Sequence, residues 1–440
     1  MARSLPDAPK WDEPKPAGKQ ITLHLKTITP MFGGGFEPRE TDPISPVRAA
    51  AIRGHLRFWW RALYGAAFEN AEQLFAAEEK LWGSAEKPGR VAISVRIDRT
   101  GTEYKEHDTT SASPRPPHCW AEWSKNNSGQ WKKPPRVVQP WPKYALFPFF
   151  GEEPMATARC LLGTEFTLAL TFDDAIREEE LRQTVSAWVR FGGIGARTRR
   201  GCGSLDDNAS GNAVLPSSHV RGEELTCLHG AIALWGNEQD SPLAAWKAAV
   251  DIYQQFRQGA GVARAPGSAS SAGGPPNRPG RSWWPEPDSI RRITGRHAAQ
   301  HKPIHPVQEG FPRADLGLPI IFHFKDYDSH KHGNEPNDPA DATLSGPAER
   351  RERFASPVIT KAVAENGRYR PLVLILNAPH VWRLGNLRLS AEKSATIAQS
   401  QIELSPGERQ QIRPLGGRPV REALAHFVAS RWHVNREVLP

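Results

Sequence analysis

The chain has 440 residues, of which 38% are hydrophobic, so it is long enough for two or three domains and can bury a sizeable core. Its 57 Lys and Arg outnumber its 48 Asp and Glu, giving a net charge of +9, either a solubility feature or a sign of an anionic partner. We expect no secretory signal, no membrane span, and no disulfide framework or zinc site from the four widely spaced cysteines, which predicts a cytoplasmic chain without a metal or other cofactor.

The first elements are a tail, a strand and the start of a helix. Residues 1–19 are rich in Pro, Lys and Asp, which predicts a mobile tail. The stretch ITLHLKTITP (21–30) alternates apolar and polar residues, as a half-buried strand does. A loop with the sequence MFGGGFEPRETDP follows, and Ser45 and Pro46 are predicted to be the N-cap and first residue of a helix.

This first helix carries an apolar face and a basic stripe. The apolar face is formed by residues spaced four, three and four apart: Ile52, Leu56, Trp59 and Leu63. Arg53, Arg57 and Arg61 repeat every four residues beside it, with no acid between residues 43 and 68 to pair with them inside the helix. Gly54 interrupts the helix and suggests that another backbone approaches closely. The stripe is either a solvated face or a phosphate-binding surface.

The next segment contains a strand and a long insertion. The stretch VAISVRI (91–97) alternates in the same way as the first strand. Residues 98–144 are rich in Pro, Trp and Lys and have weak periodicity, which predicts an insertion or functional loop rather than core structure. Their interleaved aromatic and basic residues either stack on unpaired bases or anchor the loop to its own domain.

A second strand–helix pair follows the insertion. The stretch EFTLALTF (165–172) predicts a strand, and Asp173 or Asp174 can cap the helix after it. Three glutamates at residues 178–180 suit the positive N-terminal end of that helix. A pair of glycines beginning at Gly192 is predicted to end it.

The loop after this helix combines glycine with arginine. The stretch VRFGGIGARTRRGCGSL (189–205) has five glycines and four arginines, but neither the spacing of a P-loop nor the strand-then-helix context of a dinucleotide fingerprint. Glycines let a backbone lie close to a bulky partner, and the guanidinium forks of Arg197, Arg199 and Arg200 suit phosphate oxygens. The alternative is a solvated turn in which the glycines serve geometry alone.

The two basic motifs are predicted to act together. If the start of the first helix and the loop after the second lie on the same side of one sheet, they line one channel for a phosphodiester chain, with salt-dependent affinity. The candidate binding residues are Arg48, Arg53, Gly54, Arg57, Arg61, Gly192, Gly193, Gly195, Arg197, Arg199, Arg200, Gly201 and Gly203.

The pattern of strands and helices restarts after about residue 215. A strand (GAIALW), a helix opened by Ser241 and Pro242, two further strands (318–324 and 371–377) and a terminal helix (420–432) are predicted. We therefore expect two α+β domains, at residues 20–215 and 216–440. Residues 259–282, a run of Gly, Pro, Ser and Ala, are predicted to be a flexible segment of the second domain.

Signals for catalysis are weak. His297, His301 and His305 are spaced by four, but Pro303 breaks any helix there, so scattered surface histidines are the better interpretation. The sequence has neither HExxH nor GxSxG. His24 and a second histidine, His55, are the only candidates for acid or base chemistry on RNA, and neither has an evident second group.

Several of these motifs resemble the RAMP superfamily of CRISPR proteins: TPMFGGG after the first strand, IRGHLRFWWRAL in the first helix and GGIGARTRRGCG after a helix. More narrowly, the FWWRA ending, GRSWWPEPDSIRR (280–292), FPRADLGLPIIFHF (311–324) and RRERFASPVI (350–359) resemble the first RAMP subunit of the Cmr, or type III-B, effector complex. The resemblance extends over roughly residues 21–375, and the insertion at 98–144 and the segment at 259–282 depart from it.

The resemblance implies α+β architecture with two ferredoxin-like, RRM-type (βαββαβ) domains, antiparallel sheets and inserted loops. It implies a non-catalytic, RNA-binding subunit near the 3′ part of the CRISPR guide RNA that helps capture complementary target RNA in antiviral defence. Its partners would be those two RNAs, the backbone RAMP subunit and a neighbouring terminal RAMP subunit, with no membrane.

Two other functions stay open at the level of sequence. One is a metal-independent endoribonuclease that processes CRISPR guide RNA, with His24 or His55 as acid or base. The other is a structural capping subunit whose basic faces contact only protein.

Overall fold

The computed structural model describes residues 18–109, 114–126, 128–130, 135–151, 155–207, 227–267, 280–324, 327, 337–347 and 351–439. We call residues 18–207 the N-terminal part and residues 227–439 the C-terminal part. The predicted boundary at 215–216 and nearly all of the predicted tail lie outside the described residues, so both stay predictions. No helix in the described ranges is long and apolar enough to cross a membrane.

The N-terminal part is built on an antiparallel sheet with the strand order β3-β8-β1-β9. Its strands are β1 (Lys19–Thr27), β3 (Val91–Arg99), β8 (Glu165–Phe172) and β9 (Leu205–Asp206). Helix α1 (Ala49–Tyr64) follows β1 in the chain, and α4 (Glu178–Phe191) follows β8. The alternation predicted for β1 places Ile21 and Leu25 in the core and leaves His24 exposed on the other face.

The C-terminal part repeats this arrangement with the strand order β13-β14-β10-β17. Its strands are β10 (Ile232–Trp235), β13 (Val358–Glu365), β14 (Arg368–Ile375) and β17 (Glu437–Val438). Helix α5 (Pro242–Gln258) follows β10, and α9 (Val420–Trp432) precedes β17. In both sheets the first strand therefore lies between the third and fourth strands, and the second strand lies at an edge.

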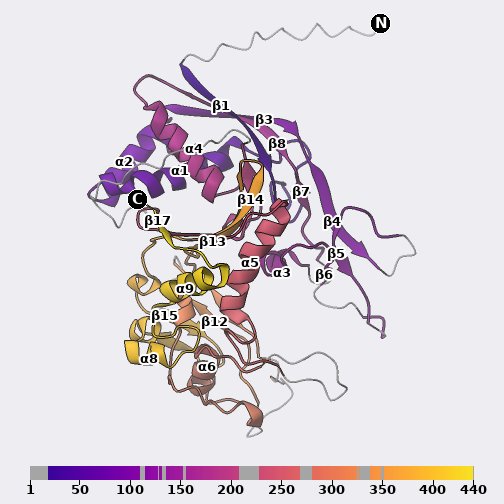
Figure 1. The fold of residues 1–440 in the computed structure, drawn as a ribbon, viewed down its shortest axis with the longest axis vertical. Helices are drawn as coiled ribbons and strands as arrows, with labels where there is room; N and C mark the ends of the chain where they lie inside the picture. The colour runs from indigo at the N-terminus through magenta and orange to yellow at the C-terminus, as the bar shows by residue number, and fades with distance from the viewer. Residues whose placement is uncertain are drawn as a thin grey trace.

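The two sheets and their helices stack in layers (Figure 1). Helices α1 and α4 lie between the first sheet and one face of the second, because residues of both sheets share one apolar core with Trp59 and Trp188. The other face of the second sheet packs on α5 and α9 through a separate cluster that includes Tyr253, Phe256 and Leu424. The N-terminal part thus contributes the helices that cover one face of the C-terminal sheet.

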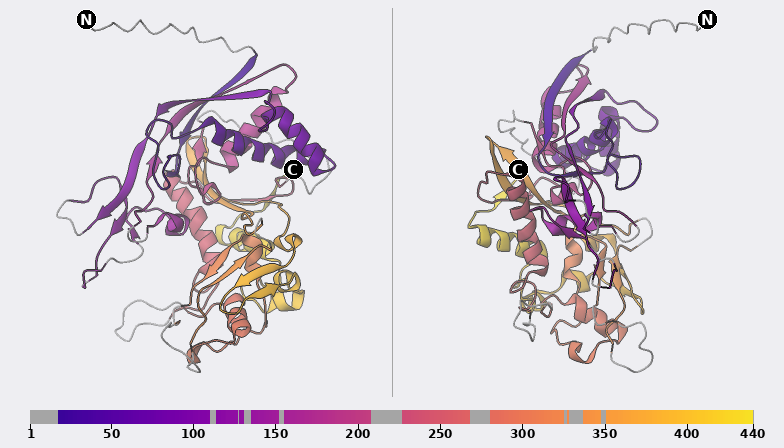
Figure 2. Two further views of the ribbon diagram at one scale, coloured as in Figure 1. Left: turned by 180° about the vertical axis from the view of Figure 1, so that it is seen from behind. Right: turned by 90° about the vertical axis from the view of Figure 1, so that its right-hand side faces the viewer.

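Two further sheets are inserted into this core. One has the order β11-β12-β15-β16 and packs on α6 (Glu286–Thr294); its strands are β11 (Ile320–Phe322), β12 (Ala342–Ser345), β15 (Leu387–Ser390) and β16 (Ala395–Ile397). The other has the order β2-β7-β4-β5-β6 and reaches α5 (Figure 2). Its strands are β2 (Met31–Phe32), β4 (Thr102–Asp108), β5 (Cys119–Trp123), β6 (Arg136–Val137) and β7 (Cys160–Leu162). Only its β4–β5 pair, among the strand pairs described, is parallel.

The second of these sheets corrects the interpretation of residues 98–144. This insertion contains regular strands, although its sequence has weak periodicity. Trp120 and Trp141 are buried, and the Trp120 indole N–H donates to the carbonyl of Ala158 at 2.9 Å. These tryptophans pack in a cluster that the insertion shares with α5 of the C-terminal part. Because their rings are buried, they are not available to stack on bases.

The observed first residues of the helices agree only in part with those predicted from the sequence. α5 has Ser241 as N-cap and Pro242 as its first residue, as predicted. The prediction for α1 was wrong, because this helix begins at Ala49, with Arg48 as N-cap. The N–H of Ser45 instead donates to the Asp42 carboxylate at 2.8 Å, which closes a turn ahead of the helix.

The predicted mixed α+β class with antiparallel sheets is confirmed. The four cysteines are all free. Of the segment predicted to be flexible, residues 268–279 lie outside the described part, whereas bridges join Ala260 to Arg264 and Arg264 to Ser282.

Lys361 of β13 links the two parts of the chain. Its buried ammonium group donates to the carbonyls of Val189 at 2.9 Å and Gly192 at 2.8 Å, at the C-terminal end of α4. A cation at this position compensates the negative end of the helix dipole. Burial, together with the nearby charge of Arg190, lowers the pKa of Lys361 to about 7.

We predict that Lys361 makes stability increase with pH above neutrality. In the unfolded chain a lysine keeps a pKa of about 10.4. Between the folded and unfolded pKa values the unfolded chain therefore binds a proton that the folded chain has lost, and the free energy of unfolding rises with pH. The expected rise is about 2 kcal/mol from pH 7 to pH 9.

Urea unfolding of the wild type and Lys361→Met at both pH values measures this effect. The substitution should abolish the lysine's contribution to the pH dependence. Equal pH dependence in the two proteins would contradict the assignment.

Candidate nucleic-acid interface

Two glycine-rich segments of the N-terminal part pack against each other through their backbones. We call residues 192–203, which follow α4, the glycine loop. Its Ala196 N–H donates to the carbonyl of Phe32 at 2.8 Å, and its Gly203 N–H donates to the carbonyl of Pro30 at 2.9 Å. The glycine loop and the chain that follows β1 therefore form one unit at the end of the first sheet.

Packing inside the chain explains most of the glycines. Gly203 has a φ of +63°, and a Cβ there would lie 1.9 Å from the carbonyl oxygen of Ile194. Gly195 has a φ of +87°, and a Cβ would lie 2.5 Å from the carbonyl oxygen of Phe32. The buried glycines of the loop are Gly192, Gly193, Gly201 and Gly203. Only Gly195 is exposed, so it alone of these five can lie directly against an external partner.

Arg200 is buried and binds protein. Its guanidinium donates to the carbonyl of Val358 at 2.6 Å and to the hydroxyl of Ser356 at 3.0 Å, and it lies 4.5 Å from the ring centroid of Tyr253. This geometry corrects the prediction of a phosphate-binding fork at Arg200. The side chain instead fastens the glycine loop to β13 and α5 of the C-terminal part.

The other two arginines of the loop also have contacts within the chain. Arg199 donates to the carbonyl of Ser356 and lies 5.4 Å from the ring centroid of Phe58 in α1. Arg197 donates to the carbonyl of Ala145 at 2.7 Å. Both are half-buried, and desolvation by burial is the main cause of the lowered pKa of each. They retain some exposed donors but are primarily structural.

The arginine stripe of α1 has a partner that the local sequence did not reveal. Arg57 and Arg61 both bind the carboxylate of Glu78, which is buried in α2 (Ala71–Trp82); the Arg61 contact is 3.1 Å. Arg53 is exposed and forms no ion pair with the described residues. The stripe is thus divided into two arginines that hold α2 in place and one that remains available.

The two motifs meet at α1 but lie on different sides of it. A cavity of about 120 Å³ lies between them, lined by His55 and Phe58 of the helix and by Thr198 and Arg199 of the loop. At 100° per residue, His55 and Arg53 are roughly 160° apart around the helix. Arg53 and the cavity side of α1 therefore face different directions, and the two other arginines of the stripe are engaged with Glu78 of α2.

A surface of small side chains joins the two flanks. Ala50, Ala51 and Gly54 are exposed, and a Cβ at Gly54 would meet no described atom within 4 Å. Arg48 lies on the side of the loop after β1, where its guanidinium donates to the carbonyl of Gly34 at 2.7 Å and to the carboxylate of Asp42 at 3.3 Å, and Arg53 lies on the other side. We call these five residues, Arg48, Ala50, Ala51, Arg53 and Gly54, the α1 saddle. A backbone crossing the helix there can approach closely and reach both cations.

The loop after β1 adds a residue that the sequence analysis missed. Phe36 follows the three half-exposed glycines at 33–35, and its side chain is 92% exposed. An exposed ring beside an open backbone can stack on an unpaired base. The signal was present in the sequence, since an aromatic residue directly after a glycine run has little local support for burial.

The outer face of the first sheet offers no comparable surface. Its described side chains on β1, β3 and β8 are polar or small, without the exposed aromatic residues that an RRM sheet uses to stack bases. His24 lies on this face and shares a hydrogen bond of 3.0 Å with Thr167. His55 lies on α1 behind the sheet, where it stacks on Trp188 and burial lowers its pKa. The two histidines therefore cannot act on one substrate as an acid–base pair.

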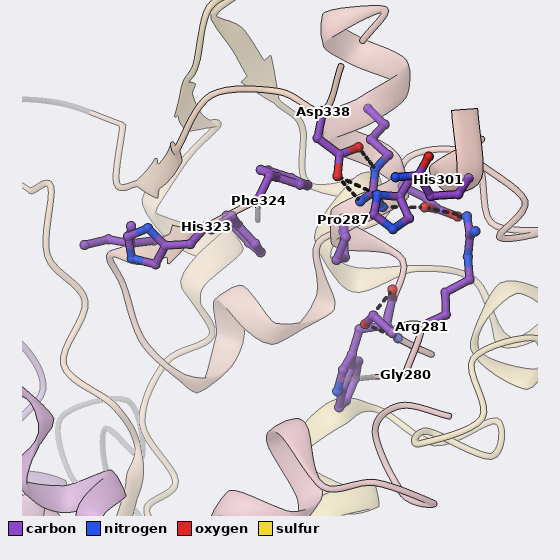
Figure 3. A pocket seen from close by; sticks show the side chains of 14 residues that line it. Gly280, Arg281, Pro287, His301, His323, Phe324 and Asp338 are labelled. Atoms are coloured by element: carbon purple, nitrogen blue, oxygen red, sulfur yellow. Dashed lines mark hydrogen bonds and ion pairs between the residues drawn. The ribbon is translucent and has the colours of Figure 1, made fainter. Parts of the chain in front are cut away.

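The histidines near residue 300 are not scattered on the surface, which corrects the prediction. His301 Nδ1 lies 2.7 Å from the buried carboxylate of Asp338, which also accepts from Arg291 (Figure 3). His305 is buried as well. His301, Asp338 and Arg291 border a cavity of about 550 Å³, and no group of three potential metal ligands occurs in the described part of the chain. Because Arg291 of α6 binds Asp338, which lies just before β12, the cluster holds α6 against the inserted sheet.

Comparison with known proteins finds a matching family model and two similar proteins. Residues 24–206 match the model of the RAMP superfamily. The CRISPR system Cmr subunit Cmr1-2 of Pyrococcus furiosus is 27% identical over 202 residues, which cover 42% of this chain and 94% of that protein. Cmr subunit Cmr1-1 of the same organism is 28% identical over 175 residues, or 38% of this chain and 43% of that protein.

Solved structures resemble the chain over most of its length. The crystal structure of Cmr1 from Pyrococcus furiosus, in its apo form, has 14% identity and a TM-score of 0.42, covering 95% of this chain and 98% of that one. A chain of the cryo-EM structure of the type III-B Cmr-beta complex bound to cognate target RNA has 11% identity and a TM-score of 0.41, covering 94% of this chain and 100% of that one.

Residues 24–206 of the chain are therefore similar to the RAMP superfamily. The chain is also a homologue of the Cmr1 subunits of Pyrococcus furiosus. The predicted resemblance to the first RAMP subunit of the Cmr complex is thereby confirmed.

We predict that Arg200→Ala destabilises the fold by about 3 kcal/mol, because it leaves buried acceptors of β13 without a donor. Thermal unfolding should show a clearly lower midpoint. The control is Arg182→Ala, which removes an exposed arginine paired with Glu178 and should change stability by less than about 0.5 kcal/mol. Similar midpoints for both variants would show that Arg200 does not join the two parts.

Proposed function

We propose that this chain is a non-catalytic RNA-binding subunit of a type III-B CRISPR RNA-guided effector complex in the cytoplasm. In this role it lies near the 3′ part of the guide RNA and helps capture complementary target RNA, in contact with a backbone RAMP subunit and a neighbouring terminal RAMP subunit. The observation that carries the proposal is the α1 saddle, a close-approach surface with a cation on each side and open glycine backbone next to it.

The chemistry of the α1 saddle favours a sugar-phosphate backbone. Arginine forks bind phosphate oxygens in a bidentate manner, and the small side chains between Arg48 and Arg53 leave room for the ribose. The exposed Gly195 and the glycines at 33–35 extend this open surface beside the helix, and Phe36 provides a ring for a base. Such contacts recognise the RNA backbone and the faces of its bases and do not depend on base sequence. A subunit that accepts many guide RNAs requires this.

We also propose that the chain contains two ferredoxin-like domains, one in each part. The support is that both main sheets follow the same chain order of strand, helix, strand, strand, helix, strand, and the same spatial order of strands. The two smaller sheets are then insertions into these domains.

The alternative of a metal-independent endoribonuclease is less well supported. Acid–base cleavage of RNA needs two groups in reach of one phosphate. His24 and His55 lie on opposite sides of the first sheet, and His55 is half-buried against Trp188. The alternative of a capping subunit that contacts only protein is separated from the proposal by RNA binding itself.

Replacing both Arg48 and Arg53 by Ala should weaken binding of single-stranded RNA about ten-fold at low salt, since two phosphate contacts are lost. The slope of log affinity against log salt should fall by about 1.4, at about 0.7 per contact with a single strand. Filter binding at several salt concentrations measures both quantities. The matched control is the pair Arg96→Ala and Arg182→Ala, two exposed arginines outside the saddle. An equal loss in both double variants would contradict a specific role of the saddle.

Gly54→Gln tests whether the RNA backbone approaches α1 closely at Gly54, and it leaves the charge of the α1 saddle unchanged. Gln is the better helix former by about 0.5 kcal/mol or more, and the site has room for it, so the fold should become slightly more stable. RNA affinity should nevertheless fall several-fold, because the side chain would stand where the RNA backbone crosses. Higher thermal stability with unchanged RNA affinity would exclude a crossing at Gly54.

A further inference from the structure

A second basic cavity lies in the C-terminal part, well separated in sequence from the α1 saddle. It has a volume of about 320 Å³ and is formed by the chain just after α5, the segment 413–418 and one face of α9. Arg413, Arg418 and Arg431 line it, together with His426. We call it the α9 pocket.

The cations of the α9 pocket lack anionic partners in the described chain. No acidic side chain lines the pocket, and none of its three arginines forms an ion pair with a described residue. Glu422, the acid of α9, is exposed but is not part of the lining. This differs from Arg57, Arg61 and other basic side chains of the chain, which are matched by carboxylates. Three like charges around one concavity repel each other unless an anion enters.

Aromatic rings orient two of these arginines without using their hydrogen bonds. The guanidinium of Arg413 lies 3.8 Å from the ring centroid of Trp283, and that of Arg431 lies 5.5 Å from that of Phe427. Stacking fixes the plane of a guanidinium and leaves its N–H edge free to donate. The pocket therefore presents preoriented donors.

The titration of His426 is consistent with a positive field at this place. Its pKa is lowered by burial and by the charges of Arg418 and Arg436. An anion in the pocket would oppose this effect and raise the pKa of His426 again. The same histidine can donate to that anion once it is protonated.

Glycine makes the backbone of the pocket accessible. Gly261 and Gly416 line it, both are exposed, and a Cβ at Gly261 would meet nothing within 4 Å. The volume accommodates a phosphate group with part of an attached sugar, and the absence of lining carboxylates disfavours a cationic or neutral ligand.

We propose that the α9 pocket binds a phosphate group of RNA, as a second contact on the C-terminal part for a strand that also crosses the α1 saddle. This inference rests on the proposed RNA-binding function for the source of the phosphate. The pocket itself requires only an oxyanion with several acceptor oxygens. Two separate contacts on one strand raise its affinity through effective concentration.

The experiment uses the full chain and a pocket variant with Arg413→Gln, Arg418→Gln and Arg431→Gln, in which glutamine keeps length and hydrogen bonding but removes charge. The control variant carries the same change at three exposed arginines that have carboxylate partners: Arg96, Arg182 and Arg388. Thermal unfolding first establishes that both variants fold. Inorganic pyrophosphate is then titrated by calorimetry, and single-stranded RNAs of increasing length are tested by filter binding.

The pocket variant should lose at least ten-fold in affinity for pyrophosphate, whereas the control should not. It should bind short RNA like the wild type and long RNA about ten-fold more weakly, with a salt slope reduced by about 0.7 for the one phosphate that the pocket neutralises. Loss of pyrophosphate binding with unchanged binding of RNA of every length would overturn RNA as the source and indicate a free phosphate or nucleotide. Unchanged affinity for both ligands would overturn the pocket.

Comparison with the variant that lacks Arg48 and Arg53 keeps the two proposals apart. If that variant loses RNA affinity and the pocket variant does not, the present inference fails while the proposed function stands. If neither variant changes RNA binding, the proposed function fails, and pyrophosphate binding alone then decides whether the pocket is an anion site.

Discussion

The buried contact between the glycine loop and strand β13 is the constraint on which the rest of the structure depends. Arg200 donates to the backbone of β13, and Lys361 of the same strand donates to the carbonyls that end α4. Both buried side chains exchange hydration for carbonyl acceptors, so their N–H groups find these partners only in the assembled fold. They fix α4 and α1 between the two main sheets, and the orientation of α1 decides which of its side chains reach the surface.

This constraint changes the meaning of a basic sequence motif. A site that binds a phosphate and a contact that joins two parts of a fold use the same residue types. The reason is that guanidinium groups donate to carbonyls as well as to phosphates. In this chain the glycine loop is largely a structural connection. The surface that we propose for RNA is the neighbouring one, where small side chains on α1 separate Arg48 from Arg53. Mutagenesis of the loop arginines would therefore mix loss of folding with loss of binding.

Local patterns predicted much of the fold. Alternation predicted strand β8 with the bounds 165–172 that the structure has, and the terminal helix α9 has the predicted bounds of 420–432. The site was less predictable, because its decisive contacts join distant residues: Arg200 with Val358, and Arg61 with Glu78 of another helix. The strands of the insertion were missed because they alternate weakly and are stabilised by tryptophans that pack on α5. No local pattern encodes such pairings.

Photocrosslinking of the full chain to single-stranded RNA that carries 4-thiouridine tests the central claim most directly, with the crosslinked peptides identified by mass spectrometry. The account predicts crosslinks in the segment that contains Phe36 and in the first turns of α1 around Gly54. Crosslinks confined to the outer face of the first sheet, in the strands that carry His24 and Arg96, would contradict it.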